Sequence, residues 1–387
     1  MKIGSLAKLS LVVLPLLAGC GNFWQPPSGT TTTTCTTNCT SGYFYVLNQK
    51  TDQVIAYDIA SSKLNPVGTT TLAVAPYTIA IAPNKNFLYV GTASGIYLFN
   101  IASGVLTVAS TTAFNPDIPG SMAIDPTGAW LVEALPSSNS VVLQATPIST
   151  VGASTASTTT PIETAPLTGT TVKQIAFSPD GKNIFLALGD GGFAVVPFTV
   201  ANTTSTPFGT AVYKGVYASG GAAVSIAVDP KSRLYYVGEV AALSGTSNTG
   251  GLRVFSYSAL PTITEITTTP LSSGGLAPSA ILPESSGAYV YVANGNGTSA
   301  GSISVFDFSS SGTTYSLTTT SLSTATGITP AGLAEESSNT YLLLVDSSGG
   351  PDLNAFTFSS STGALTSAFT STTGTDPVEA VAITATP

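Results

Sequence analysis

The sequence predicts an all-β fold, a seven-bladed β-propeller with four-stranded antiparallel blades, and three observations lead to it. A pair of short apolar strands joined by a Pro, Gly, Asp or Ser turn recurs along the chain. A third strand with alternating apolar residues follows each pair. The last copy of the pair has a first strand but no second strand. Near the start of the chain, a second strand occurs without a first strand before it. Repeats of about 50 residues with four short strands are typical of propeller blades.

The strand pairs are clearest at Pro76–Pro83, followed by a strand from Phe87, and at Ile175–Gly181, followed by a strand from Ile184. Each pair is predicted to be two strands joined by a tight turn. The other complete pairs start at Ser121, Ser225, Ser279 and Gly332, and the third strands start at Val54, Gly95, Val141, Gly192, Leu252, Ser302 and Leu353. The sequence pattern that predicts a fourth strand in each blade is weaker than that of the first three strands. We expect strand aromatic residues to fill the core between blades, among them Tyr89, Phe185, Tyr235 and Tyr291.

The incomplete copies at the two ends of the chain complement each other. The strand from Val378 has no partner after it, and Tyr43–Asn48 is a second strand with no first strand before it. We expect these segments to pair and close the last blade, because pairing removes free edges that promote aggregation. A β-sandwich is the competing fold, but it would not give seven copies of one turn signature. Residues 43–387 are therefore expected to form one propeller.

The N-terminal residues have the pattern of a secretory signal. Lys2 and Lys8 precede the apolar run Leu9–Ala18, which is too short to span a membrane stably. The run ends in Leu-Ala-Gly-Cys, which resembles the lipobox of bacterial lipoproteins. The resemblance implies a signal peptide over residues 1–19 and a lipid on Cys20 that anchors the protein to a membrane. An ordinary cleaved signal with an incidental cysteine is the alternative.

Residues 20–42 are expected to form a flexible tether, because they are rich in Pro, Thr and Ser and have no apolar periodicity. A linker of this length typically reaches about 25 Å. Gly21 is not the Asp associated with inner-membrane retention of lipoproteins, so we expect a cell-envelope location at the outer membrane, on its periplasmic or surface side. Cys35 and Cys39 lie in the tether, where either a disulfide or two unpaired thiols would be compatible with an oxidising compartment.

Composition excludes several classes of function. Charged residues make up 8% of the chain and the net charge is −8, so no basic surface is available to bind nucleic acid. The chain has no histidine, which excludes His-dependent hydrolases and His-ligated metal centres. Two tether cysteines do not complete a four-ligand zinc site. We expect no cofactor and no metal site, with single Ca²⁺ sites made from loop carbonyls left open.

Two segments, Ile175–Ala187 and Tyr289–Phe308, resemble the YVTN-type propeller repeat and the seven-bladed lactonase-like family. The resemblance extends over residues 43–387 and implies the propeller fold. In lactonase-like members, histidine and arginine at the starts of the innermost strands supply the polar site over the channel. None of the corresponding strand starts in this chain carries either residue, so the resemblance assigns no catalytic residue here.

A site is expected where the innermost strands start and the second strands end, because both ring the channel on one face. Glu133 and Glu239 would accept hydrogen bonds from hydroxyl groups, Lys173 or Arg253 would meet a carboxylate, and Tyr77 would offer a stacking surface. The full set of candidate ligand-binding residues is Tyr77, Glu133, Lys173, Gln174, Glu239, Arg253 and Glu379. The alternative is that these loop positions are polar because loops are solvated.

The function expected from the sequence is that of an extracytoplasmic, lipid-anchored propeller that binds a protein or an envelope glycan. The alternative is a lactonase-like hydrolase of the 6-phosphogluconolactonase type that acts on a sugar lactone. A passive coat component without a saturable ligand is a third interpretation. The propeller fold does not distinguish among these three functions, because proteins with one fold can have many different activities.

The lipid anchor predicts the behaviour of a Cys20→Ser variant. Without the thiol there is no atom to carry the lipid, so the variant is expected to leave the membrane fraction and to lose the mass of the lipid. Cell fractionation and mass spectrometry of the intact protein measure both effects. A variant that stays membrane-bound with unchanged mass contradicts the anchor.

Overall fold

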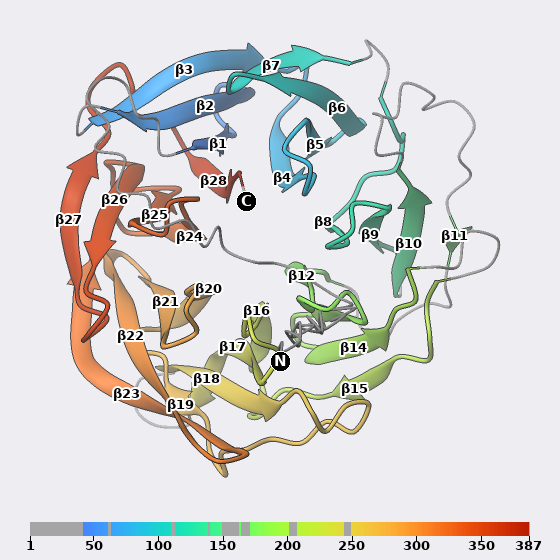
Figure 1. Cartoon of the computed structure of the whole chain (residues 1–387), viewed down its shortest axis with the longest axis vertical. Helices are drawn as coiled ribbons and strands as arrows, with labels where there is room; N and C mark the ends of the chain where they lie inside the picture. Colours follow the sequence, from blue (N-terminus) through green and yellow to red (C-terminus); the bar gives the residue numbers. More distant parts are fainter. Residues whose placement is uncertain are drawn as a thin grey trace, which may run out of the picture. The chain divides into compact units, whose positions relative to one another are not determined.

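The computed structural model shows seven four-stranded antiparallel sheets arranged around a central channel (Figure 1). The described residues contain strands and turns but no helix, and therefore no helix that could cross a membrane. The predicted all-β, seven-bladed propeller is confirmed. Cys20, Cys35 and Cys39 lie outside the described residues. The structure describes residues 42–386 apart from 61–62, 110–112, 138–139, 149–161, 164–170, 201–206 and 244–248.

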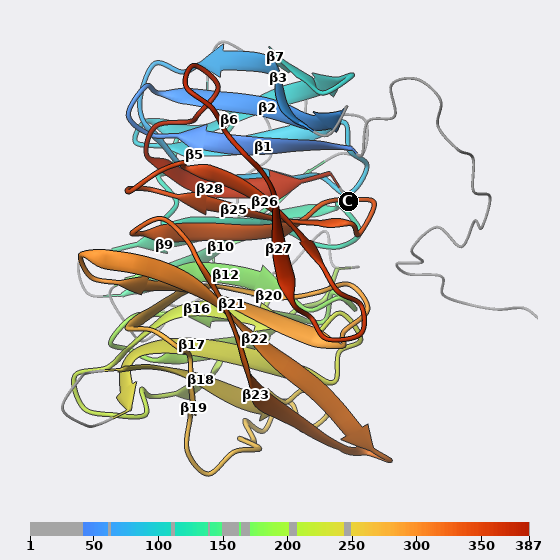
Figure 2. The same ribbon diagram turned by 90° about the vertical axis from the view of Figure 1, so that its left-hand side faces the viewer.

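Each blade runs outward from an innermost strand at the channel to a fourth strand at the rim, and neighbouring blades pack face to face (Figure 2). From the innermost strand outward, the blades are: blade 1, β28 (Ala380–Ala385), β1 (Tyr43–Asn48), β2 (Gln53–Ala60) and β3 (Lys63–Thr71); blade 2, β4 (Pro76–Ile81), β5 (Phe87–Thr92), β6 (Gly95–Ala102) and β7 (Val105–Val108); blade 3, β8 (Ser121–Ile124), β9 (Trp130–Pro136), β10 (Val141–Pro147) and β11 (Ile162–Glu163); blade 4, β12 (Gln174–Phe177), β13 (Asn183–Ala187), β14 (Phe193–Pro197) and β15 (Val212–Lys214); blade 5, β16 (Ala222–Val228), β17 (Leu234–Leu243), β18 (Thr249–Ser256) and β19 (Leu271–Ser272); blade 6, β20 (Ala277–Pro283), β21 (Tyr289–Asn296), β22 (Ser299–Ser311) and β23 (Thr314–Ala325); blade 7, β24 (Pro330–Glu335), β25 (Tyr341–Asp346), β26 (Leu353–Phe358) and β27 (Leu365–Thr370).

The ring closes as the sequence predicts, because C-terminal β28 pairs with N-terminal β1 in blade 1. Their antiparallel ladder runs from Phe44 opposite Ala385 to Asn48 opposite Ala380. β28 begins at Ala380, two residues later than predicted. Glu379 before it has a φ of 56°, in the left-handed region, which interrupts the extended backbone.

The core lies between the blades and is filled by side chains of the second and third strands. All four aromatic residues predicted for this core are buried, with 0–1% of their surface exposed: Tyr89, Phe185, Tyr235 and Tyr291. Between blades 4 and 5, for example, Phe185 lies 4.9 Å from Tyr235 and Phe193 lies 4.9 Å from Phe255, measured between ring centroids. Such aromatic pairs contribute about 0.5–1.5 kcal/mol each beyond the area that they bury.

Carboxylates stabilise several turns between first and second strands. Asp125 accepts hydrogen bonds from the backbone N–H groups of Trp130 at 2.6 Å and Thr127 at 2.8 Å. Glu284 accepts one from Ala288 at 2.7 Å in the corresponding turn of blade 6. Asp125 and Glu284 are 0% and 3% exposed, so these acidic side chains hold backbone amides and are not available to a ligand.

Ring closure predicts the effect of deleting Tyr43–Asn48. Without β1, the innermost strand β28 loses its partner and blade 1 separates into unpaired edges, so the whole propeller is expected to lose cooperative unfolding. Circular dichroism during thermal unfolding measures this. Deletion of residues 21–34, which precede the propeller, is the control and is expected to leave the unfolding midpoint unchanged. Equal midpoints for both deletions would contradict the role of β1.

Candidate functional site

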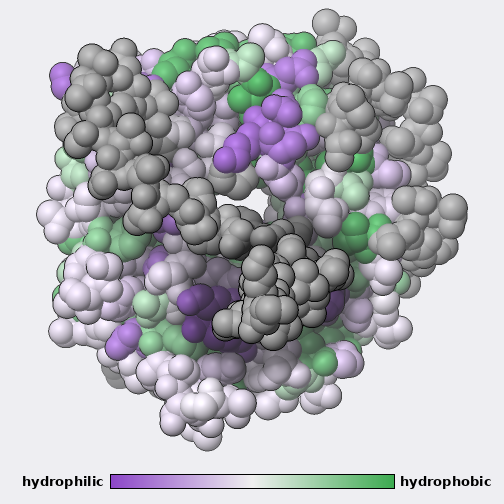
Figure 3. Space-filling model, viewed as in Figure 1, coloured by the Kyte–Doolittle hydropathy of each residue, from purple (hydrophilic) through white to green (hydrophobic). Residues whose placement is uncertain are grey.

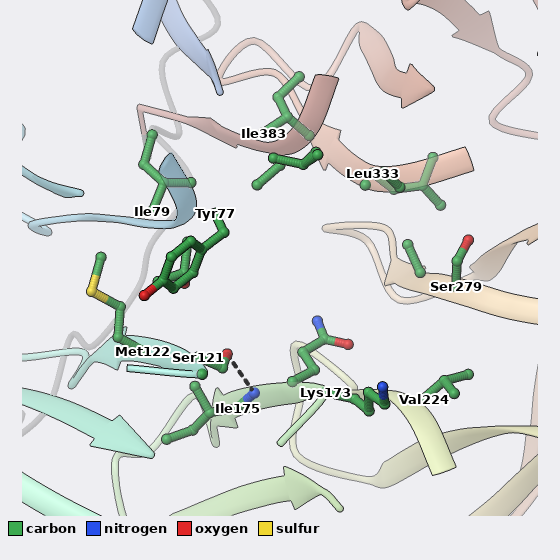
Figure 4. A pocket seen from close by; sticks show the side chains of 18 of the residues that line it. Tyr77, Ile79, Ser121, Met122, Lys173, Ile175, Val224, Ser279, Leu333 and Ile383 are labelled. Atoms are coloured by element: carbon green, nitrogen blue, oxygen red, sulfur yellow. Dashed lines mark hydrogen bonds between the residues drawn. The ribbon is translucent and has the colours of Figure 1, made fainter. Parts of the chain in front are cut away.

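A cavity of about 250 Å³ lies in the central channel and is lined by residues from the innermost strands of all seven blades (Figure 4). Its lining combines small and apolar residues with a few polar side chains. Ile79, Met122 and Leu333 are among the apolar ones. The polar side chains are Tyr77, Thr78, Ser121, Lys173, Gln174 and Ser279. Tyr77, Lys173 and Gln174 are thus the predicted site residues that the structure brings together in the channel.

Lys173 is the one charged residue among those that line the cavity. It directly precedes β12, and its backbone N–H donates to the carbonyl of Ala187 at 2.9 Å, which fixes its position at the strand start. The side chain is exposed. In the part of the chain that the structure describes, no carboxylate lies within 4.0 Å of its ammonium group. Among the described residues, the ammonium group that Lys173 presents to the channel therefore has no anionic partner.

Tyr77 reaches the same cavity from β4. Its hydroxyl donates to the backbone carbonyl of Thr92 at 2.7 Å, and burial raises the pKa of the phenol. Because the proton of this hydroxyl is engaged, the oxygen is left with lone pairs that accept hydrogen bonds. Tyr77 is thus prepared to accept a hydrogen bond from a ligand hydroxyl.

Two other polar side chains of the lining connect neighbouring blades. Ser121 Oγ accepts a hydrogen bond from the backbone N–H of Ile175 at 3.2 Å, drawn as the dashed line in Figure 4. Gln174 Oε1 accepts one from the backbone N–H of Ile226 at 3.0 Å. These side chains satisfy backbone groups of the next innermost strand. Gln174 therefore lines the cavity and also connects blade 4 to blade 5.

Ser121 and Ser279 were not predicted as site residues. Both belong to the repeated first-strand motif, as SMAI from Ser121 and SAIL from Ser279. A serine at the start of this motif in two blades therefore indicates a hydroxyl group near the channel. The sequence alone does not distinguish this hydroxyl from the many serines of the outer strands and loops.

Arg253 and Glu239 lie in a buried ion-pair network away from the cavity. Arg253 is 1% exposed, and its Nη1 donates to Glu239 Oε1 at 2.8 Å. Its Nε and Nη2 donate to the two carboxylate oxygens of Glu265, each at 2.8 Å. Glu239 also accepts the backbone N–H of Tyr217 at 2.8 Å. Both predicted site residues are thus used to hold blade 5 together, and neither is available to a ligand in the channel.

Glu133 is likewise fully buried, between blades 2 and 3. Asn115 Nδ2 donates to both of its carboxyl oxygens, at 3.1 and 2.9 Å, and Thr146 Oγ1 donates at 3.3 Å. Burial raises the pKa of Glu133 to about 8; these hydrogen bonds oppose the shift, and nearby Asp117 adds to it. At neutral pH the side chain is therefore mainly protonated and holds the connection that leads to β8.

Glu379 lies outside the cavity lining, on the connection that leads to β28. Its carboxylate is 3.5 Å from Lys50 Nζ, and both side chains are largely exposed. Exposed ion pairs of this kind contribute little to stability. Within the described part of the chain, no group of three or more Asp, Glu, Cys or His residues is arranged to hold a metal ion.

The blades and the polar cavity define a seven-bladed propeller with a channel site of small-molecule size. Residues 53–382 match the family model described as "Lactonase, 7-bladed beta-propeller". The chain therefore belongs to this family. A search of curated protein sequences found no significant match.

Several solved structures share the fold at low sequence identity. A putative 6-phosphogluconolactonase from Bacteroides fragilis has a TM-score of 0.68 and 15% identity, with 91% of this chain and 99% of that chain covered. The periplasmic gluconolactonase of Pseudomonas aeruginosa has a TM-score of 0.65 and 14% identity, with 89% and 98% covered. Hydrazine synthase of Kuenenia stuttgartiensis has a TM-score of 0.57 and 14% identity, with 86% and 99% covered. At such identities the likeness shows the fold alone.

The buried network predicts a large loss of stability for Arg253→Met. The variant leaves Glu239 buried without its cation, which typically costs about 3–5 kcal/mol. Urea unfolding measures the free energy. Lys50→Met, which removes the exposed partner of Glu379, is the control and is expected to change the unfolding midpoint little. Similar midpoints for the two variants would contradict a structural role for Arg253.

Proposed function

We propose that this protein is a lactone hydrolase that takes a sugar lactone into the channel cavity, with Lys173 contacting the lactone carbonyl oxygen. The observation that carries the proposal is the unpaired ammonium group of Lys173 in a cavity lined otherwise by hydroxyl, amide and apolar groups. Membership of the lactonase propeller family supports a lactone as substrate. Two similar structures are those of a putative 6-phosphogluconolactonase and a gluconolactonase, which supports a sugar lactone as the substrate.

The size of the cavity favours a small molecule. Ligand cavities commonly have volumes of roughly 300–1,000 Å³, and this one has about 250 Å³. A single sugar ring is compatible with that space, whereas a glycan chain or a protein loop would have to contact the surface outside it. The surface seen down the ring carries few strongly hydrophilic residues (Figure 3), in line with the low content of charged residues.

The proposed reaction adds water to the carbonyl carbon of the lactone. Negative charge then develops on the carbonyl oxygen, where the Lys173 ammonium would stabilise it. Collapse of this intermediate breaks the bond between the carbonyl carbon and the ring oxygen, the ring oxygen takes up a proton, and an open-chain hydroxy acid forms. Tyr77, whose own proton is donated to Thr92, would accept a hydrogen bond from a sugar hydroxyl and orient the ring.

Binding without turnover is the second candidate function. The residues that line the cavity include no carboxylate, imidazole or guanidinium group. The lining therefore offers charge stabilisation but no carboxylate or imidazole base to activate water. A protein of this kind would hold the sugar acid through Lys173 and act as a binding module.

We also propose that the propeller is displayed outside the cytoplasm on a lipid attached to Cys20. The sequence of residues 1–20 is the support for this location. A protein or envelope-glycan partner belongs to the same proposal and would contact the outer surface of the propeller.

Replacement of Lys173 tests the channel site. The purified parent protein is expected to hydrolyse glucono-δ-lactone, and Lys173→Met is expected to lower kcat/KM by about 10²–10³-fold, as for the loss of one oxyanion-stabilising group. Lys173→Arg, which keeps the charge, is expected to retain part of the activity. The control is Lys50→Met, which removes a lysine outside the lining. A pH-stat assay of acid release measures turnover, and calorimetry with gluconate measures binding.

The outcomes separate the candidates. Turnover that Lys173→Met abolishes and Lys50→Met leaves intact supports the hydrolase. Saturable gluconate binding that depends on Lys173 without any turnover supports the binding module. Activity that persists in Lys173→Met, or the absence of both turnover and binding, overturns the assignment of the channel to sugar lactones and acids.

A further inference from the structure

Polar side chains where the second strands end repeatedly hold the connection that arrives from the preceding blade. Glu239 in β17 accepts the backbone N–H of Tyr217 at 2.8 Å, and Asn294 in β21 donates to the backbone carbonyl of Ser273 at 2.8 Å. Each of these connections leads directly into an innermost strand of the channel. The side chain at this position of the second strand therefore determines how the incoming connection is held at the channel mouth.

Asp346, at the end of β25 in blade 7, is the exception at this position. It is 0% exposed, and neither of its carboxyl oxygens has a hydrogen-bond partner. It packs against the connection from blade 6, since a Cβ built on Gly327 would lie 2.8 Å from Asp346 Cγ. Its backbone N–H donates to the carbonyl of Asp352 at 2.9 Å, which holds it in place. The carboxyl group is therefore enclosed without a donor.

Among the residues that the structure describes, no cation forms an ion pair with this carboxyl group. The connection 325–330 and the neighbouring residues 294–302 of blade 6 contain no ionisable side chain. Across the β25–β26 turn lies Asp352, whose backbone N–H donates to Asp376 and whose carboxylate accepts the backbone N–H of Glu379. Lys50 contacts Glu379 at 3.5 Å on the surface. The charged side chain that acts on Asp346 is thus the acid Asp352, next to a second acid, Asp376.

An ionised carboxylate is unfavourable in this place because burial without hydrogen bonds or an opposite charge costs several kcal/mol. Burial raises the pKa of Asp346 to about 7, and Asp352 adds to the shift. The backbone of Gly327 opposes the shift, although no donor reaches either oxygen with hydrogen-bond geometry. Below about pH 7, the closed arrangement therefore contains the protonated acid.

We propose that Asp346 is a pH-sensitive switch that loosens the seam between blades 6 and 7 at the channel mouth when its carboxyl group ionises. Ionisation draws water to the side chain and displaces the Gly327 connection that packs against it. That connection leads into β24, which supplies Ala331, Gly332 and Leu333 to the cavity (Figure 1). Opening of the seam between blades 6 and 7 would thus move the wall of the proposed ligand site. The opening itself does not depend on which ligand the channel binds.

The direction of the pH effect follows from the raised pKa. Below pH 4 the acid is protonated in both the folded and the unfolded chain, and its contribution to stability is fully present. As the pH rises from about 4 to about 7, the unfolded chain ionises first, so this contribution decreases. Above pH 7 it is lost, and the seam opens in the folded protein.

Amide hydrogen exchange of residues 325–333, measured without ligand between pH 5.5 and 8.5, tests the proposal. After correction for the intrinsic pH dependence of exchange, protection in the parent is expected to fall by about 10-fold or more between pH 5.5 and neutral pH and to level off above it, because the solvated carboxyl group of the open state ionises at a lower pH than that of the closed state. Asp346→Asn is expected to keep the protection constant, because the amide is neutral at every pH used. Asparagine already stands at the end of β1, at Asn48, and just before the register shift of the β21–β22 ladder, at Asn294.

Glu133→Gln is the matched control, because it neutralises the buried acid of blade 3 and leaves the seam between blades 6 and 7 untouched. It is expected to retain the pH response of residues 325–333. Constant protection in the parent, or the same response in Asp346→Asn as in the parent, overturns the proposal. Because no ligand is used, this result is independent of whether the channel binds sugar lactones. The pH at which protection in the parent stops falling tests whether the closed state ionises near pH 7.

Discussion

The propeller depends on the pairing of β1 with β28, which joins the first and last segments of the chain in one sheet. Blade 1 contacts both blade 2 and blade 7, so the ladder between Phe44 and Ala385 and its neighbours joins one end of the blade series to the other. Tyr43 and Thr386 extend it, with the Thr386 N–H donating to the Tyr43 carbonyl at 2.8 Å. Every innermost strand takes its place at the channel through this closure. The cavity exists only because the ring is complete.

Hydrogen bonds between innermost strands add a second constraint around the channel. Ser121 and Gln174 accept backbone N–H groups of the next blade, and Ser225 Oγ donates to the carbonyl of Pro278 at 2.6 Å. Each bond satisfies a backbone group that has no ladder partner on that side, as buried backbone groups require. Of the six polar side chains that line the cavity, Ser121 and Gln174 thus connect neighbouring blades, whereas Lys173 is the charged one.

Several of the few charged residues of the chain are used inside the structure. Asp125 and Glu284 hold turns, and Glu239 pairs with Arg253 in the core of blade 5. This member of the lactonase propeller family has the strands, turns and ring closure of the fold. Its cavity is lined by hydroxyl, amide and apolar groups and by the ammonium group of Lys173. Similar structures at 14–15% identity show how the fold persists when the side chains change. Function then depends on the site and not on the fold.

The fold was predictable because its signals are local. Alternating apolar strands and Asp, Gly or Pro turns recur in order, and the unmatched strands at Tyr43 and near Val378 point to each other. Lys173 was also predictable as a channel residue, since it stands at the start of an innermost strand. These features depend on periodicity and chain order, which the sequence contains by itself.

Only the tertiary structure decided which polar side chains face the channel and which enter the core. Glu239 lies at a register shift of the β17–β18 ladder, and such a shift changes the face on which a side chain lies. Glu265, the second carboxylate that pairs with Arg253, comes from a loop with no recognisable motif. The burial of Asp346 depends on a connection from another blade. Contacts between blades set these directions, and such contacts are long-range properties that no local pattern of residues encodes.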